Sequence, residues 1–155
     1  LAKKIGVKSL FFADHRKAHE AYAMKCNPRF ACIFCKRIML RIAEKLAERE
    51  DCDFLITGES MGQVASQTLD NMAVIQPVVK INVFSPLLGF DKNDIIKIAR
   101  KIGTFEKSIE KSPGCPYLPP HPATTAKPEK LEQEEVKLDI DKLVDGSLES
   151  ARIVF

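Results

Sequence analysis

Cysteine is the residue type in this sequence whose spacing points most directly to chemistry. Cys32 and Cys35 are separated by two residues, a spacing that lets a pair of thiolates bind one metal ion or cluster. On spacing alone, the pair is compatible with half of a zinc site, a redox-active dithiol or an iron–sulfur cluster. A third cysteine, Cys115, lies in the proline-rich segment 112–122, which is too irregular for a helix or strand and would hold the thiol rigidly.

The remaining cysteines and a histidine pair carry weaker signals. The total of five cysteines is odd, which argues against a disulfide scaffold and for metal, redox or nucleophile chemistry at some of them. Cys26 and Cys52 are interpreted as structural. His15 and His19 lie one turn apart in an expected helix and could bind a metal, but no third ligand is evident near them in the sequence. Two polar side chains on the exposed face of a helix are therefore the simpler interpretation of this pair.

The segment 55–71, LITGESMGQVASQTLDN, has the pattern of a strand, a turn and a helix. A short apolar strand over 53–57 is followed by Gly58, whose lack of a Cβ allows a tight turn and the close approach of a ligand. We expect the chain to continue as a helix that carries Val64 and Leu69. Loops at the carboxyl ends of strands bind small ligands in open α/β sheets. On pattern alone, however, an ordinary strand-to-helix turn is the favoured interpretation.

Length and composition describe one ordinary globular domain. The 155 residues are 29% charged and 45% hydrophobic. No apolar run approaches the roughly 20 residues of a membrane span, and the amino end has no signal-peptide pattern, so we expect a cytoplasmic protein. The net charge is +3, and the positive charge is concentrated in residues 1–50, which carry twelve Lys and Arg against five Asp and Glu. This basic third suits a polyanion such as tRNA or the phosphates of ATP, although charge alone favours a solvated helix face.

The apolar periodicity predicts strands alternating with helices. The expected strands cover residues 7–12, 53–57 and 81–87, and the expected helices cover 1–5, 14–25, 29–50, 92–102, 128–138 and 141–149. In the helix 29–50 one apolar stripe is formed by Phe34, Ile38, Ile42 and Leu46. Such alternation predicts a parallel sheet with helices on both faces. Three strands are few for that architecture, so we expect an amino-terminal part to be missing from this sequence.

Four segments are similar, in order and spacing, to the ThiI family of tRNA 4-thiouridine synthetases, or tRNA sulfurtransferases, in the PP-loop ATP-pyrophosphatase group. These segments are CIFCKRIMLRIAEKLAE, ITGESMGQVASQTLDN, SPLLGFDKNDIIKIARKIGT and the loop around Cys115. The resemblance extends from Leu1 to about Lys142. It implies an α/β fold of the Rossmann-like adenine nucleotide α-hydrolase type, incomplete at the amino end. Residues 1–155 would then form a single partial PP-loop domain.

The sequence departs from the family pattern in the regions that it lacks. A PP-loop of the SGGxDS kind, whose backbone N–H groups cradle the pyrophosphate of ATP, does not occur in these residues. A THUMP tRNA-binding region and a rhodanese-like region are not recognisable either. We expect that the chain is a portion of a longer protein, that another chain supplies the missing part, or that adenylation has been lost. A CxxC pair without a rhodanese-like region resembles the archaeal-type members, in which the pair and a later cysteine hold an iron–sulfur cluster.

The resemblance implies ATP-dependent sulfur transfer, with Mg²⁺, to uridine 8 of tRNA. A uracil oxygen would be adenylated, and a sulfur nucleophile would then displace AMP. The implied partners are tRNA, a sulfur donor (sulfide or the persulfide of a cysteine desulfurase) and a chain that carries the PP-loop and THUMP region. A homodimer is compatible with the resemblance, and a membrane is not expected. Two alternatives remain open: a non-catalytic nucleotide- or cluster-binding subunit, and a sulfur carrier for thiamine synthesis.

The family positions, carried over residue by residue, imply a nucleotide site at Lys36, Gly58 and Gln67. Lys36 at the start of a helix can reach a phosphate or sugar, and Gln67 offers a paired donor and acceptor to an adenine or ribose edge. Lys92 matches a lysine that acts in the ATP chemistry. Lys92 directly follows the expected helix cap Asp91, so its positive charge lies at the N-terminus of the helix, where the helix dipole disfavours a cation. We therefore expect Lys92 to be catalytic and to steady phosphate charge in the transition state.

The resemblance also implies roles for the three cysteines. Cys115 matches a catalytic cysteine that resolves a persulfide in rhodanese-bearing members and binds the cluster in the others. We expect Cys32, Cys35 and Cys115 to hold an iron–sulfur cluster with one iron open to sulfide. The alternative is a metal-free dithiol that handles a persulfide.

Basic side chains near the CxxC pair are the expected contacts to the tRNA backbone. They are Arg29, Lys36, Arg37 and Arg41. Removing their charge should weaken tRNA binding and reduce its dependence on salt.

Overall fold

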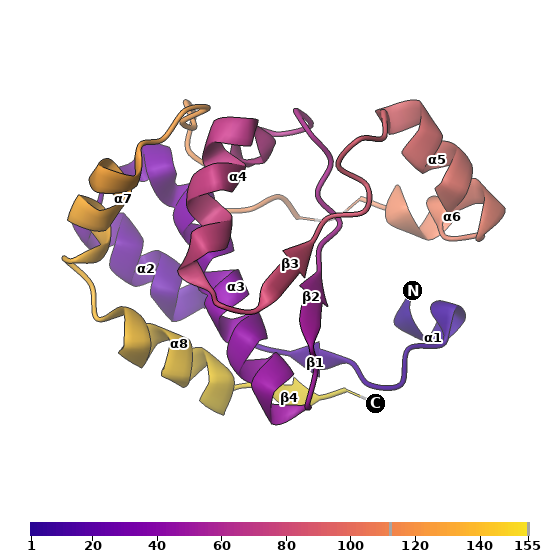
Figure 1. The fold of residues 1–155 in the computed structure, drawn as a ribbon, viewed down its shortest axis with the longest axis horizontal. Helices are drawn as coiled ribbons and strands as arrows, with labels where there is room; N and C mark the ends of the chain where they lie inside the picture. The colour runs from indigo at the N-terminus through magenta and orange to yellow at the C-terminus, as the bar shows by residue number, and fades with distance from the viewer. Residues whose placement is uncertain (112, 155) are drawn as a thin grey trace.

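The computed structural model describes residues 1–111 and 113–154, and its elements follow the alternating order that the sequence predicts (Figure 1). The α-helices are α1 Ala2–Ile5, α2 Arg16–Lys25, α3 Ala31–Arg49, α4 Leu69–Ile75, α5 Lys92–Lys101, α6 Phe105–Ser108, α7 Pro128–Glu135 and α8 Ile140–Glu149. Short 3₁₀ helices are η1 Pro28–Phe30, η2 Ala65–Gln67 and η3 Gln76–Val78. The strands are β1 Phe11–Phe12, β2 Phe54–Ile56, β3 Asn82–Phe84 and β4 Arg152–Ile153.

Helix α3 is the central element, and it is buried on two sides rather than along one stripe. Phe34, Ile38 and Ile42 pack with Tyr22 of α2 and Val144 of α8, and burial of each such side chain stabilises the fold by about 1.5–3 kcal/mol. A second cluster joins α3 to α4 and to the chain that leads into α7: Ile33, Leu40, Val74, Ile75, Ala123, Ala126 and Leu131. Figure 1 shows α2 and α8 on one side of α3 and α4 on the other.

The strands β2 and β3 form a parallel pair, which is the unit expected of this α/β fold. Leu55 lies opposite Val83, and Ile56 lies opposite Phe84. The connection between the two strands runs through α4 and η3, so the pair is the βαβ type of crossover. Leu55 and Val83 pack against the second core cluster, whereas Phe54, Ile56 and Phe84 on the other side of the pair are 48%, 65% and 54% exposed.

A second pair of strands joins a segment near the amino end of the chain to a segment near its carboxyl end. β1 and β4 run antiparallel, with Phe11 opposite Ile153. The sequence predicts a strand over residues 7–12, but the paired part is only two residues long, and β4 was not predicted at all. A strand of two residues is too short to leave a periodic apolar pattern in the sequence.

The helix after β2 begins later than the sequence predicts. Val64 lies before η2, and the helix proper, α4, starts at Leu69, where the Thr68 hydroxyl accepts a hydrogen bond from the backbone N–H of Asn71. The tight turn in this loop is at Gly62, whose φ of 73° favours glycine, and not at Gly58. By contrast, the cap expected at Asp91 is confirmed, since its carboxylate accepts hydrogen bonds from the first turn of α5.

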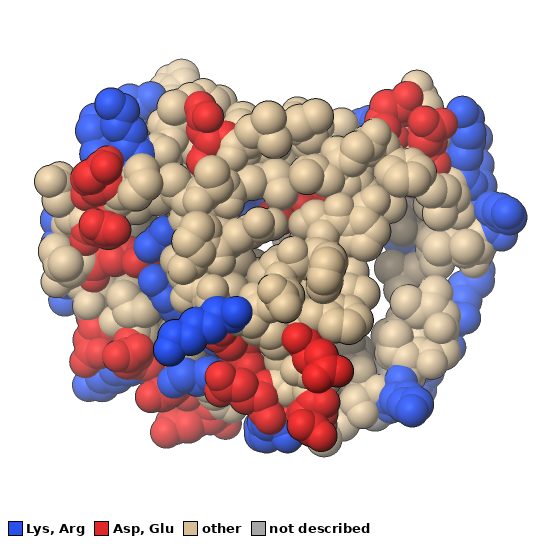
Figure 2. Space-filling model, in the orientation of Figure 1, with Lys and Arg blue, Asp and Glu red and all other residues tan. Residues whose placement is uncertain are grey.

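Charge is unevenly spread over the face seen in Figure 2. Acidic and basic side chains alternate around α7, α8 and the end of α3, while the area over α4 and β3 is mostly uncharged. Among the described residues, no helix has both the length and the apolar character needed to cross a membrane.

Candidate active site

Two loops lie side by side where β2 and β3 end. The backbone N–H of Thr57 donates to the carbonyl of Phe84 at 2.8 Å, and the hydroxyls of Thr57 and Ser85 are hydrogen-bonded at 2.8 Å. Further along, the Ser60 hydroxyl donates to the carbonyl of Phe90 at 3.2 Å. The carboxyl ends of parallel strands are where open α/β sheets bind small ligands. This edge, which we call the strand-end site, is thus a candidate ligand site on geometry alone.

Lys36 of α3 reaches the strand-end site. Its ammonium group forms an ion pair with the carboxylate of Glu59, and the two side chains are only 22% and 12% exposed. The other carboxylate oxygen of Glu59 accepts a hydrogen bond from the Thr57 hydroxyl at 3.3 Å. A half-buried cation, a carboxylate and hydroxyl groups therefore share one edge of the sheet, and that arrangement can bind a polar, anionic ligand.

The other residues predicted for the nucleotide site lie along the same two loops. A Cβ built on Gly58 would have no atom within 4 Å, so open space adjoins the backbone there. Gln67 is half-buried in η2, and its carbonyl accepts a hydrogen bond from the N–H of Gly62 at 2.9 Å. Lys92 is exposed in the first turn of α5. The structure brings Lys36 and Gly58 to the strand-end site, with Gln67 and Lys92 further along the chain from it.

Cys32 and Cys35 lie one turn apart on α3. Burial, together with the nearby charges of Cys115 and Cys32, raises the pKa of the Cys35 thiol to about 11. The pKa of Cys32 is raised by burial and by Cys115 in the same way. Lys36 acts in the opposite direction on both pKa values, because its positive charge favours the thiolates of Cys32 and Cys35.

The histidine pair of α2 meets α3 at Cys35, which the sequence did not reveal. The Nε2 atoms of His19 and His15 lie 3.1 Å and 3.6 Å from the Sγ atom of Cys35. Tyr117 stacks on His19 with 4.7 Å between ring centroids and so ties the segment next to Cys115 to α2. Cys35 is the side chain beside the histidines that the sequence did not show. The spacing of four residues between the histidines was the available signal, but their partner lies in another helix.

The arginines predicted to contact tRNA have different surroundings. Arg37 is buried, its guanidinium donates to both carboxylate oxygens of Glu135 at 2.7 and 2.8 Å, and it also donates to the carbonyl of Val74. Arg41 makes two hydrogen bonds to the same carboxylate at 3.0 and 2.9 Å. Both side chains thus fasten α7 to α3, a geometry that does not favour contact with tRNA. Arg29 is exposed and stays the better prediction of the three.

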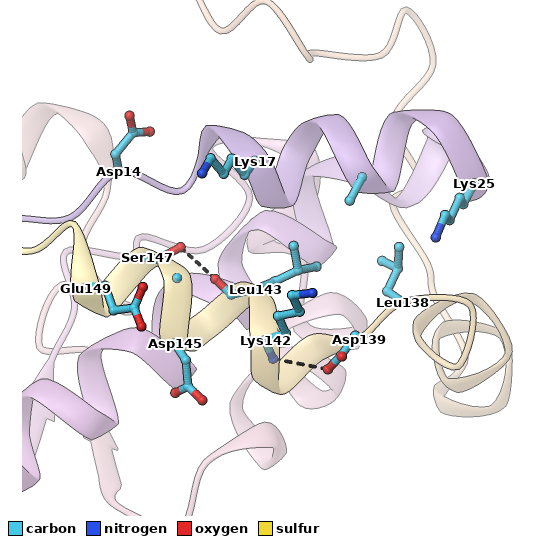
Figure 3. A pocket seen from close by; sticks show the side chains of 12 residues that line it. Asp14, Lys17, Lys25, Leu138, Asp139, Lys142, Leu143, Asp145, Ser147 and Glu149 are labelled. Carbon is cyan, nitrogen blue, oxygen red and sulfur yellow. Dashed lines mark hydrogen bonds between the residues drawn. The ribbon is translucent and has the colours of Figure 1, made fainter.

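A cavity of about 760 Å³ lies elsewhere, between α2 and α8 (Figure 3). Its lining carries both signs of charge, from residues such as Lys17, Lys142, Asp139 and Glu149. None of the residues predicted for the chemistry lines it. The size of a cavity therefore does not identify the candidate site, and the chemistry of the side chains favours the strand-end site and the cysteines of α3 instead.

A parallel strand pair joined through a helix, with a polar site at the carboxyl ends of its strands, defines a protein of the α/β class. The chain matches the model of the family described as "Thiamine biosynthesis protein (ThiI)" over residues 4–140. The chain therefore belongs to the ThiI family.

Individual relatives agree with this assignment. The chain is 56% identical over 111 residues to a "Probable tRNA sulfurtransferase" of Methanocaldococcus jannaschii, which covers 70% of this chain and 29% of that protein. It is 39% identical over 156 residues to a protein of the same name in Moorella thermoacetica, covering 99% of this chain and 40% of the other. The chain spans about a third of the length of such relatives.

A solved structure is similar over nearly the whole chain. It is described as a 4-thiouridine synthetase–RNA complex with bound ATP. It is 35% identical, with a TM-score of 0.87, and covers 94% of this chain and 38% of that one. The α/β fold of the PP-loop type that the sequence predicts is thereby confirmed.

Proposed function

We propose that this chain takes part in ATP-dependent sulfur transfer to tRNA, which converts uridine 8 to 4-thiouridine in the cytoplasm. The observation that carries the proposal is the position of Lys36. Its ammonium group pairs with Glu59 at the strand-end site, and its charge also acts on Cys32 and Cys35. One side chain thus links an edge suited to a nucleotide with a cluster of thiols suited to sulfur.

The reaction requires these two parts to be adjacent. The O4 atom of uracil attacks the α-phosphorus of ATP, which forms an O–P bond and releases pyrophosphate, with Mg²⁺ balancing the phosphate charge. A sulfide nucleophile then attacks C4, so that a C–S bond forms, the C4–O bond breaks and AMP leaves with the oxygen. The sulfur must therefore be delivered close to the adenylated base.

The nucleotide would be bound by Lys36, Gly58 and Gln67. The open space beside Gly58 lets a ligand approach the backbone. Lys36 would contribute a charge-assisted hydrogen bond to a phosphate oxygen in place of its bond to Glu59. Lys92, exposed on α5, would steady the charge that develops as pyrophosphate and AMP leave.

An iron–sulfur cluster held by Cys32, Cys35 and Cys115 is supported by the CxxC spacing on α3 and by the influence of Cys115 on the pKa of both other thiols. Such a cluster would supply an iron position for the sulfide. Cys32 and Cys35 would hold it on α3 and Cys115 on the loop, with sulfide or a desulfurase persulfide as the donor. A dithiol that handles a persulfide is the alternative use of the same residues.

The proposal is tested by calorimetric titration of the chain with ATP and Mg²⁺. We expect binding that is lost in Gln67→Ala and kept in the control Gln133→Ala, which changes an exposed glutamine of α7. Absence of binding would overturn an ATP site in this chain alone. It would favour instead a subunit whose site is completed by a partner, a reading that the missing SGGxDS sequence supports.

A further inference from the structure

Two histidines and one cysteine converge where α2 packs against α3. The Nε2 atom of His19 lies 3.1 Å from the Sγ atom of Cys35, and that of His15 lies 3.6 Å from the same sulfur. All three atoms lie within 4.8 Å of one another. Within residues 1–111 and 113–154, this is the one group of three His, Cys, Asp or Glu side chains with such an arrangement.

The three side chains are held in place by the packing around them. His15 is the N-cap of α2 and His19 lies one turn further, so both imidazoles lie on the same face of the helix with their rings 5.1 Å apart. His19 is buried and stacks on Tyr117 with an angle of 8° between the rings. Cys35 is half-buried in the second turn of α3. Little conformational freedom is lost when such a group takes up a ligand.

We propose that His15, His19 and Cys35 bind a single divalent transition-metal ion of the zinc type. Two imidazole nitrogens and a thiolate are a ligand set that suits Zn²⁺. In a tetrahedral zinc site with ordinary Zn–N and Zn–S bonds, the nitrogen and sulfur ligand atoms lie about 3.5 Å apart. The two distances to Cys35 lie on either side of this value, so an ion can enter with small side-chain movements. The fourth coordination position is left to water or another ligand.

This ion and the iron–sulfur cluster proposed above both need Cys35. When the Cys35 thiolate binds the zinc-type ion with His15 and His19, it cannot also bind a cluster with Cys32 and Cys115. The two sites are therefore mutually exclusive, and the zinc-type ion marks a state of the protein without the cluster. The inference goes beyond the sulfur-transfer proposal and does not depend on it, since the three ligand atoms are arranged without reference to ATP or tRNA.

The test is a titration of the full chain with Co²⁺, a spectroscopic substitute for Zn²⁺, under anaerobic conditions with a phosphine reductant. We expect one equivalent to bind, with the visible absorption of tetrahedral cobalt and a sulfur-to-cobalt charge-transfer band, and Zn²⁺ to displace it. Cys35→Ser should abolish the charge-transfer band. His15→Ala should weaken binding by more than the roughly 10–100-fold that loss of an outer-shell partner costs.

Matched variants separate this site from the cysteine cluster. Cys32→Ser and Cys115→Ser remove thiols from the cluster set only and should leave the cobalt spectrum intact, as should Cys52→Ser at an exposed cysteine. Because His15 is half-buried, its variant should keep the melting temperature of the parent. Absence of cobalt binding would overturn the proposal, as would a spectrum that requires Cys32 and Cys115, or a folded His15→Ala chain with unchanged affinity. No iron, sulfide, ATP or tRNA is present, so failure here is distinct from failure of the sulfur-transfer proposal.

Discussion

Lys36 of α3 and Glu59 of the loop after β2 form a half-buried ion pair that joins the longest helix to the strand-end site. The pair has a consequence for ligand binding, because each partner neutralises the other. A phosphate that reaches this edge is attracted by Lys36 and repelled by Glu59. The two residues should therefore affect nucleotide affinity in opposite directions.

We expect Lys36→Gln to weaken ATP binding about 10- to 100-fold, the value of one charge-assisted hydrogen bond. Glu59→Gln should instead strengthen binding, because the lysine is freed and a negative charge is removed. Calorimetric titration of both variants measures the two affinities. If both substitutions weakened binding equally, Glu59 would be a ligand of the nucleotide or of its Mg²⁺, contrary to this prediction.

The buried contact of Glu135 with Arg37 and Arg41 should contribute strongly to stability. Glu135→Gln leaves the buried guanidinium of Arg37 without its counter-charge, so the free energy of unfolding should fall by about 3 kcal/mol. Urea unfolding followed by circular dichroism measures the loss. The exposed pair Lys45–Asp145 is the control, and Asp145→Asn should change stability by less than about 1 kcal/mol. Equal losses in the two variants would contradict the structural role.

The same contact predicts how stability depends on pH. Burial opposes ionisation of Glu135, but the hydrogen bonds from Arg37 and Arg41 outweigh it and hold the pKa below the ordinary value of 4.5. The stabilisation is thus present above about pH 4.5 and is lost as the pH falls through the lower, folded-state pKa. Unfolding curves measured across that range should be less pH-dependent in Glu135→Gln than in the parent.

The thiols should differ in reactivity. Because burial and neighbouring thiolates raise the pKa of Cys35 to about 11, little of it is ionised near neutral pH. Iodoacetamide should therefore label the exposed Cys52 well before Cys35, as measured by peptide mass spectrometry over time. Lys36→Gln should slow the labelling of Cys35 further, because the charge that favours its thiolate is removed. Faster labelling of Cys35 than of Cys52 would contradict this ordering.

Anaerobic reconstitution with iron and sulfide should give visible charge-transfer absorption if the three cysteines hold a cluster. Serine at position 32, 35 or 115 should remove most of that absorption, whereas Cys26→Ser should preserve it. A colourless reconstituted protein would favour the dithiol alternative. Prior addition of Zn²⁺ should reduce the yield of cluster, since both ligand sets use Cys35.

The contribution of the basic side chains to tRNA binding can be separated residue by residue. We expect Arg29→Ala to reduce the salt dependence of tRNA binding by about one unit of slope, as for loss of a single phosphate contact. Arg37→Ala should change stability more than the salt slope, because Glu135 already neutralises its charge. Filter-binding titrations at several salt concentrations measure both slopes, and a reduced slope in a folded Arg37→Ala chain would restore Arg37 as a tRNA contact.

Local features were the part of this fold that could be predicted from the sequence. Asp91 caps its helix as expected because a cap depends on only three or four neighbouring residues. The helix after β2 was predicted too early because its polar loop contains apolar residues, such as Val64, that resemble the start of a helical stripe. The capping hydroxyl of Thr68 was the signal that marks the true start.

Contacts between elements that lie far apart in the sequence could not be predicted from local sequence patterns. Arg37 was expected at the surface because it lies off the apolar stripe, yet Glu135, 98 residues away, covers it. The meeting of His19 with Cys35 depends in the same way on how α2 packs against α3, which periodicity does not specify. The grouping of Cys115 with the CxxC pair followed only from family resemblance and stays a prediction, which the stacking of Tyr117 on His19 supports.

The apolar side of the β2–β3 pair also matters for handling the protein in solution. Phe54 and Phe84 pack edge to face at 5.4 Å between ring centroids, and they remain about half exposed together with Ile56. Within the described residues no third strand pairs with β2 or β3, so backbone hydrogen-bonding groups stand beside this apolar surface. Unpaired strand edges next to exposed aromatic rings are sites where copies of a chain associate. Self-association through this edge should therefore increase with protein concentration, and samples for the titrations above are best kept dilute.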